Sequence, residues 1–238
     1  MSRPPSRPPV YRLPRERRVA DIMAAARKVF EDKGYDEALI SDIAERAHVV
    51  EGTIYRYFEN KRALLAKVAE HWYAGMLTDY DQGLQDIRGT WNRLRFMIWR
   101  HLVTVRQEPA MCRLVFQVLR MSEGYRDTAV FQMNRAYTRR VVEILSDAQA
   151  SGEFADDIPV RLVRDMIYGC VEHHTWAYLR GEGDFSPDEA ADAITDLVYR
   201  GLATPKAAVP VSSEDYAARI ARVTGRLEHL SAKPRSSG

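Results

Sequence analysis

One segment of the chain, residues 41–61 with the sequence SDIAERAHVVEGTIYRYFENK, constrains the fold more than any other. Its pattern predicts two short amphipathic helices joined by a tight turn, and the second helix carries a glycine, a hydroxyl, two tyrosines and an arginine. A helix of two turns with that composition suits contact with phosphates and base edges better than it suits catalysis. The segment therefore predicts a helix-turn-helix that binds double-stranded DNA.

The second of these helices divides into two faces when successive residues are placed 100° apart. Ile54 and Phe58 form its apolar side, which must pack against the neighbouring helices. The opposite side carries Gly52, Thr53, Tyr55 and Arg56, with Tyr57 on a flank. Lys61 opens the next helix behind a predicted Asn60 cap, where a cation and free amide donors both favour phosphate. The alternative is that the two tyrosines are half-buried aromatics of a small helical core.

At these residues the chain resembles the TetR family of transcriptional regulators. The resemblance runs from Ile22 to about Leu65, and it rests on a first helix closed by Gly-Tyr, the IAERA helix, GTIYRYF and NK-x-x-LL, in that order. It implies a DNA-reading domain here, a helical ligand-binding and dimerisation domain in the remainder, and release of operator DNA on ligand binding. The DNA contacts implied by position are Gly52 and Tyr55 for bases, and Thr53, Tyr57 and Lys61 for phosphates.

The segment departs from the family pattern in three places. Ala38 and Leu39 stand where Thr or Ser is usual before the second helix, so a hydroxyl cap and a phosphate contact are not expected there. His48 replaces the usual turn glycine, and a positive φ at a non-glycine residue is strained. Val50 and Glu51 precede the glycine, and Glu51 is repelled by phosphate but can accept from a cytosine amino group. We therefore expect an unusual operator sequence.

The chain has 238 residues, enough for one such domain and a larger helical one. The predicted divisions are an arm (1–14), a helix-turn-helix domain (15–62), a helical effector-binding and dimerisation domain (63–204), and a linker with an extra helix (205–238). Six arginines crowd the first 18 residues among prolines, so we expect a disordered arm that reaches phosphates or a minor groove. A solvated leader without a role in DNA binding is the alternative.

Helical periodicity dominates the rest of the chain, which predicts an all-α protein. Helices are expected from Lys61 onward and at about 91–107, 109–121, 125–151, 159–180, 187–203 and 214–230. By the resemblance, the helices at 159–180 and 187–203 pack against their copies as a four-helix interface. A homodimer would also bring two recognition helices to successive major grooves.

The middle of the chain is rich in large adaptable side chains, which are compatible with a mostly apolar cavity. The predicted ligand-binding residues are His101, Phe116, Arg120, Tyr137, Tyr168, Cys170 and His173. For each of them core packing is the alternative, and only the resemblance favours a cavity. Residues 152–179 look more like the fatty-acyl-CoA-responsive FadR-type branch of the family than like its drug-sensing branch, which implies a hydrophobic acyl or aryl thioester as effector. Arg95, Arg113 and Arg120 are then available for its phosphate groups, with surface salt bridges as the alternative.

Nothing in the sequence argues for a cofactor, a metal or catalysis. Cys112 and Cys170 match no disulfide or zinc spacing. Cys170 and His174 are four apart and could share an ion, but two ligands do not make a site. An all-α metal protein or enzyme using Cys170, His173 and His174 therefore remains an alternative, as does an architectural DNA-binding protein without effector. We expect reduced thiols, no signal peptide, no bilayer-spanning segment and a cytoplasmic location.

Overall fold

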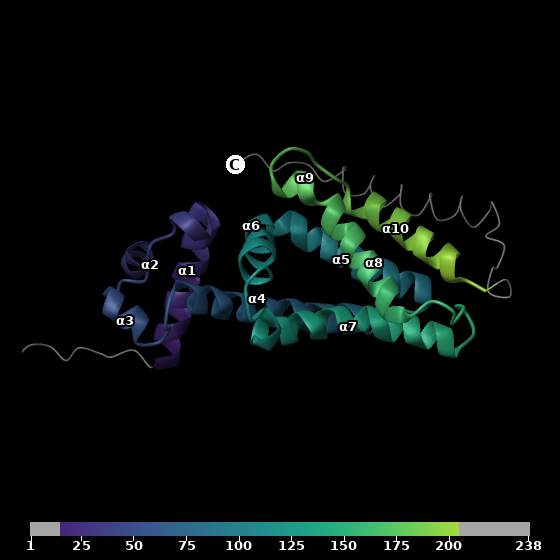
Figure 1. The fold of residues 1–238 in the computed structure, drawn as a ribbon, viewed down its shortest axis with the longest axis horizontal. Helices are drawn as coiled ribbons and strands as arrows, with labels where there is room; N and C mark the ends of the chain where they lie inside the picture. Colours follow the sequence, from purple (N-terminus) through teal and green to yellow (C-terminus); the bar gives the residue numbers. More distant parts are fainter. Residues whose placement is uncertain (1–14, 205–238) are drawn as a thin grey trace, which may run out of the picture.

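A computed structural model of the chain describes residues 15–204. These residues fold into helices, and the only β-type pairing among them is an isolated bridge between Phe154 and Ala203. The all-α prediction is confirmed, with a small N-terminal group of helices beside a larger helical layer structure (Figure 1). The predicted basic arm and the predicted helix at 214–230 lie outside the described residues.

The small domain consists of α1 (Arg15–Glu37), α2 (Ile40–Arg46) and α3 (Glu51–Tyr55). Gly34 interrupts α1 with a φ of 76°, a conformation that glycine adopts without steric cost, and this kink lies where the sequence predicts the helix to end. The three helices enclose a small apolar core that includes Ile22, Phe30, Ile43, Ile54 and Phe58.

Helix α4 (Lys61–Leu84) connects the two domains without a break. It begins as the sequence predicts, because the Asn60 side chain accepts a hydrogen bond of 2.8 Å from the backbone N–H of Ala63. Its buried residues include Leu64 and Val68 near the DNA-binding domain and Trp72, Met76 and Tyr80 further along. One rigid element therefore contributes to both cores.

The large domain continues with α5 (Thr90–Gln107), α6 (Pro109–Arg113), the π-helix η1 (Leu114–Leu119), the 3-10 turn η2 (Tyr125–Asp127), α7 (Ala129–Ala150), α8 (Val160–His174), α9 (Trp176–Leu179) and α10 (Pro187–Leu202). Two of the predicted helices break at threonines. Thr128 caps α7 by accepting from the N–H of Phe131, at 3.2 Å. Thr175 turns its hydroxyl back onto the carbonyl of Val171, at 3.1 Å, where α8 ends.

These helices form two layers that diverge toward the DNA-binding domain. Helix α7 lies along α4 in one layer, while α5, α8 and α10 form the other (Figure 1). Between the layers, at the end nearest the small domain, α6 and η1 pack against α1. The space where α4, α5, α7 and α8 face one another is the position of the main cavity.

Candidate DNA-binding face and effector cavity

The predicted face of the recognition helix agrees with the structure. Ile54 and Phe58 are buried, whereas Tyr55 is 51% exposed. The other predicted DNA contacts on α3 and the following turn are exposed at Gly52 and Arg56 and half-buried at Thr53 and Tyr57. Burial of Tyr55 in the core is therefore excluded, and its ring is free to reach a groove.

Gly52 has no packing role among residues 15–204. Apart from its chain neighbours and its own helix backbone, no atom of these residues lies within 4 Å of where a Cβ would be, and Gly52 does not have a positive φ. Neither crowding nor backbone strain requires a glycine at this position. The missing side chain instead leaves room for a DNA backbone to approach α3 closely.

Lys61 opens α4 as predicted, but its side chain already has partners within the protein. Its ammonium group donates to the carbonyl oxygens of Tyr35 at 2.7 Å, Asp36 at 3.3 Å and Ala38 at 3.0 Å. It also lies 4.5 Å from the centre of the Tyr35 ring. An ammonium has three donors, so these bonds use all of them and leave none for phosphate. In this structure Lys61 satisfies the carbonyls at the end of α1 rather than serving as a free phosphate contact.

The turn between α2 and α3 has the strain that the sequence predicts. His48 adopts a φ of 52°, the left-handed region that favours glycine. Leu39 precedes α2 and has no hydroxyl to cap it, but its N–H donates to the Asp42 carboxylate at 3.1 Å. The ammonium of Lys33, 2.8 Å from the same carboxylate, lowers the pKa of Asp42. An acidic residue inside the first turn thus takes over part of the missing cap.

The large domain contains a half-open cavity of about 800 Å³ between α4, α5, η1, α7 and α8. Five of the residues predicted to bind ligand lie in its lining: His101, Phe116, Arg120, Tyr137 and Tyr168. Trp72, Met76, Val105 and Phe131 add apolar surface that the sequence analysis did not assign to a ligand. A volume of this size is within the range of small-molecule sites.

Cys170 and His173 do not belong to this cavity, contrary to the sequence-based assignment. Both are exposed and neither lines it. Tyr168 and Glu172, one helical turn apart on α8, do face the cavity. Cys170 is displaced by about 200° from Tyr168 around the helix axis, so it points outward.

Two of the three arginines suggested for phosphate groups also have other roles. Arg95 pairs with Asp188 and Asp192 of α10, and Arg113 donates to the carbonyl of Leu179 at 3.0 Å. Neither lines the cavity. These arginines join helices, which is the alternative that the sequence left open.

A buried polar network forms one wall of the cavity. The Tyr137 hydroxyl hydrogen-bonds to Nδ1 of His101 and lies 3.3 Å from the Tyr80 hydroxyl. Burial, with a smaller contribution from Arg120, lowers the pKa of His101 to about 4, so its imidazole is neutral at pH 7. Burial likewise raises the pKa of Tyr80 to about 12. His101 and Tyr137 are therefore hydrogen-bonding groups in the cavity lining, whereas Tyr80 does not itself line the cavity.

The lining also contains arginines that the sequence analysis missed: Arg135, Arg139, Arg140, Arg161 and Arg164. The first three belong to the run RAYTRR, and each one alone resembles a solvated helix arginine. Only the packing of α7 against α8 brings the two groups to one cavity.

Within residues 15–204, no group of three or more His, Cys, Asp or Glu side chains is arranged to hold a metal ion. In the same residues, no helix is long and apolar enough to cross a bilayer.

An exposed recognition helix on a three-helix domain, joined by one continuous helix to a domain with an internal cavity, defines a helix-turn-helix DNA-binding protein with a ligand-binding domain. The family described as "Bacterial regulatory proteins, tetR family" matches residues 22–68, and "Tetracyclin repressor-like, C-terminal domain" matches residues 88–202. The chain belongs to the TetR family of transcriptional regulators. It is a ligand-responsive regulator of transcription, and its family is one of regulators rather than enzymes.

The chain is similar to the fatty acid metabolism regulator protein of Bacillus subtilis, with 23% identity over 76% of this chain and 93% of that protein. It is also 26% identical to the transcriptional activator FasR of Mycolicibacterium smegmatis, over 80% of this chain and 85% of FasR. The crystal structure of FadR from Bacillus subtilis in complex with stearoyl-CoA superposes with a TM-score of 0.68 at 22% identity, covering 76% of this chain and 98% of FadR. This likeness shows a shared fold.

Proposed function

We propose that the protein binds operator DNA as a homodimer and represses transcription until a hydrophobic effector, an acyl or aryl thioester, occupies the cavity. The observation that carries this proposal is the cavity of about 800 Å³ in the domain that α4 joins to the recognition helix. The aromatic side chains of its lining suit the apolar part of a ligand, and the neutral His101–Tyr137 pair can orient one polar group of it.

The dimer is supported by apolar side chains that the single chain leaves exposed. Leu162 and Met166 on α8 are 52% and 62% exposed, and Leu197 on α10 is 74% exposed. Cys170 and His173 continue the same outward stripe of α8, one and two turns beyond Met166. Because exposed apolar patches of this kind mark association surfaces, we place the two-fold interface on α8 and α10.

Two contacts link the cavity region to the DNA-binding domain. Arg27 of α1 pairs with Glu108, which immediately precedes α6. Arg62, in the first turn of α4, donates to the carbonyl of Val118 in η1 at 3.0 Å. The same π-helix contributes Phe116 to the cavity lining. A ligand that shifts η1 would therefore change how α1 and α4 are held, and with them the spacing of the two recognition helices.

Linkage sets the test of this coupling. If ligand weakens operator binding by some factor, operator must weaken ligand binding by the same factor, and typical couplings are about 1–3 kcal/mol. We would titrate acyl- and aryl-CoA thioesters into a fluorescent operator complex and measure anisotropy, then measure ligand affinity with and without operator. Tight ligand binding with unchanged operator affinity would overturn the coupling. Failure of the whole panel would reject only the thioester class.

A matched pair of variants sharpens the same experiment. Arg62→Ala removes one link to η1, so it should retain both binding activities but show a smaller coupling factor. Arg180→Ala is the control, because Arg180 is exposed and pairs only with Glu182 in the described part of the chain. Equal coupling in both variants would exclude this route.

Repression itself is tested by transcription in a purified system. Added protein should lower transcription from a promoter that contains the operator, and effector should restore it. Increased transcription would show an activator instead. Equal affinity for unrelated duplexes at matched salt would favour an architectural protein.

A further inference from the structure

The recognition helix begins at an apolar residue that the packing of the chain does not explain. Val50 is the N-cap residue of α3, and its side chain is 74% exposed. The preceding residue, Val49, is half-buried against the core, whereas Val50 does not pack on the core of the described residues. Within residues 15–204, a loss of the Val50 side chain would therefore cost almost no buried apolar contact.

A valine at an N-cap also lowers the stability of the helix that follows it. Helices prefer Ser, Thr, Asp or Asn at this position, because a side-chain oxygen can accept from a free N–H of the first turn. Other helices of the chain begin in that way: Asn60 caps α4, and Ser186 caps α10 by accepting from the N–H of Glu189 at 3.3 Å. No side chain of the described residues caps α3. A residue that breaks a local rule without a compensating contact indicates a function outside the chain.

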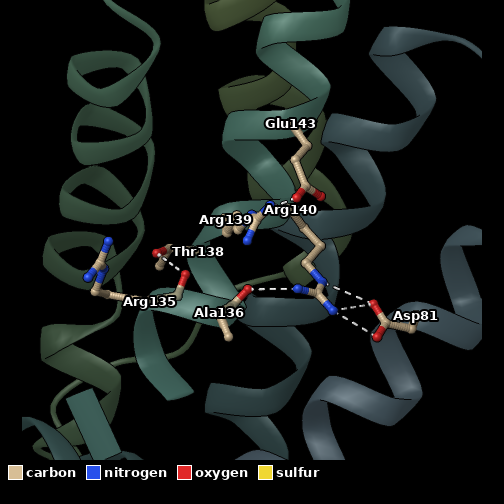
Figure 2. Close-up of polar contacts among 7 residues, drawn as sticks. All are labelled: Asp81, Arg135, Ala136, Thr138, Arg139, Arg140 and Glu143. Carbon is tan, nitrogen blue, oxygen red and sulfur yellow. Dashed lines mark hydrogen bonds and ion pairs between the residues drawn. The ribbon is translucent and has the colours of Figure 1, made fainter. Parts of the chain in front are cut away.

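Glu51, the first residue of α3, has an unpaired carboxylate. It is exposed, and its side chain forms no hydrogen bond or ion pair with any residue from 15 to 204. A carboxylate with a structural role is paired, as in Asp81 of α4, where each oxygen accepts from Arg140 of α7 at 2.8 Å (Figure 2). Phosphates repel a free carboxylate on the face of α3, so Glu51 weakens DNA binding unless a donor on the DNA meets it.

The edges of the bases limit which donor can meet Glu51. An ionised carboxylate can only accept hydrogen bonds. In the major groove guanine and thymine present acceptors, and adenine places its N7 acceptor beside its amino group. Cytosine presents an amino donor, and the neighbouring atom on its edge is the apolar C5 carbon. Of the four bases, cytosine is therefore the best match for Glu51.

Val50 matches the apolar group of the same groove. Its side chain cannot form a hydrogen bond, and the apolar group in the major groove is the 5-methyl group of a pyrimidine. In helix-turn-helix proteins the first residues of the recognition helix contact base edges. Consecutive Cα atoms are about 3.8 Å apart and stacked base pairs about 3.4 Å, so Val50 and Glu51 can reach one base pair or two neighbouring ones. Gly52 has no side chain to hold them away from the bases.

We propose that Val50 and Glu51 are a specificity-determining pair, in which Glu51 accepts from a cytosine amino group and Val50 contacts a pyrimidine 5-methyl group beside it. The methyl group can belong to a thymine in the neighbouring base pair or to the same base as 5-methylcytosine. The proposal rests on operator binding through α3, which belongs to the proposed function, and it specifies the base chemistry of the operator.

The experiment starts by selecting binding sites for the full-length wild-type protein from a random duplex library. Each selected half-site should contain a cytosine, and its replacement should weaken binding by about 5-fold or more. If a neighbouring thymine supplies the methyl group, deoxyuridine in its place should weaken binding by about 4-fold per half-site, the effect of exposing one methyl-sized group. If the cytosine supplies it, methylation of that cytosine at C5 should strengthen binding by about the same factor.

Two variants assign the two contacts. Val50→Ser should no longer respond to the methyl group, and its thermal unfolding temperature should rise, because serine can cap α3. Glu51→Gln should lose the preference for cytosine over adenine, since an amide pairs with N6 and N7 of adenine. Leu39→Ala is the matched control. Leu39 is the apolar N-cap residue of α2 and is 58% exposed, so its loss should leave both preferences unchanged.

The outcomes separate this proposal from the proposed function. Selected half-sites without a cytosine, no effect of either methyl substitution on the wild type, or a methyl effect that persists in Val50→Ser would each overturn the base assignment and leave operator binding intact. A lower unfolding temperature of Val50→Ser would overturn it as well, because Val50 would then have a structural role. If the selection enriched no sequence, operator binding itself would be excluded, and the base assignment with it.

Discussion

The two domains place their polar groups in opposite ways. In the DNA-binding domain Ile54 and Phe58 are buried in the core, and the proposed DNA contacts of α3 face outward. In the large domain the proposed ligand contacts face inward, where His101 and Tyr137 hydrogen-bond in the lining of a cavity. The difference follows from the partners, because a groove of DNA must be approached from outside whereas a small ligand must be enclosed.

The two domains also differ in the features that lower their stability. The small domain concentrates its strain in the backbone, at the positive φ of His48. The large domain carries buried polar atoms instead. The Nε1–H of Trp99 and the hydroxyl of Thr195 are buried without a hydrogen-bond partner among residues 15–204. Such groups destabilise a fold by about 1–3 kcal/mol each. Stability is therefore lowered in the large domain by buried polar atoms of its interior, and in the small domain by the strained turn at His48.

The largest expected effect tests whether operator binding by the small domain requires dimerisation through the large domain. Met166→Glu places a charge on the exposed stripe of α8, and two-fold symmetry brings it near its own copy. The variant should become monomeric and lose operator affinity by about 100-fold or more, since one recognition helix contacts a single half-site. Sedimentation and anisotropy would measure both. Met121→Glu is the control, because Met121 is 80% exposed and lies outside α8 and α10; a dimeric Met166→Glu protein would contradict the interface.

The next effect distinguishes a residue on the exposed face of α3, Tyr55, from a residue that stabilises the domain, Lys61. Tyr55→Ala should weaken specific operator binding by about 1–3 kcal/mol and leave thermal stability unchanged, because the ring is half exposed. Lys61→Ala should do the reverse and lower stability first, since three carbonyls of the α1 end lose their donor. Anisotropy and calorimetry on the same samples would decide. If the Lys61→Ala protein had normal stability and a reduced salt dependence of DNA binding, Lys61 would be a phosphate contact after all.

An acid-dependent effect should be confined to the large domain. The folded pKa of His101 is about 4, below the ordinary value of 6.5, so the unfolded chain takes up the proton first as pH falls. The stability associated with neutral His101 is fully present above pH 6.5 and is lost progressively toward pH 4. Between pH 7 and pH 5 the loss should be about 2 kcal/mol. Urea unfolding of wild type and His101→Gln at both pH values measures it, and an identical pH dependence in the two proteins would be the contrary result.

The smallest effect concerns the strained turn of the DNA-binding domain. His48→Gly should raise the free energy of unfolding by about 0.5–1 kcal/mol, because the left-handed conformation has no steric cost for glycine. Glu45→Gly, inside α2, is the matched control and should lower it by a similar amount. Denaturant midpoints would show both changes, and destabilisation by His48→Gly would mean that the imidazole makes a contact worth more than the strain.

Local patterns were sufficient wherever neighbours in sequence determine the conformation. The Asn60 cap, the end of the regular first helix at Gly34 and the positive φ of His48 all depend on a few adjacent residues, and the structure agrees with each prediction. The same holds for the two faces of α3, because helical periodicity alone separates Ile54 from Tyr55. The breaks at Thr128 and Thr175 were missed, since a threonine hydroxyl can cap a helix or bond back to it without a distinct sequence signal.

The sequence by itself determined an all-α regulator with an outward-facing recognition helix, because periodicity, caps and family motifs are local properties of the chain. Only the tertiary structure decided the inside of the large domain. In the folded protein Cys170 is exposed to solvent, and the Lys61 ammonium donates to backbone carbonyls. Arg135 of α7 and Arg161 of α8 both line the same cavity. Whether an arginine pairs, caps or faces a cavity depends on residues far away in the chain, and these contacts exist only once the helices have packed.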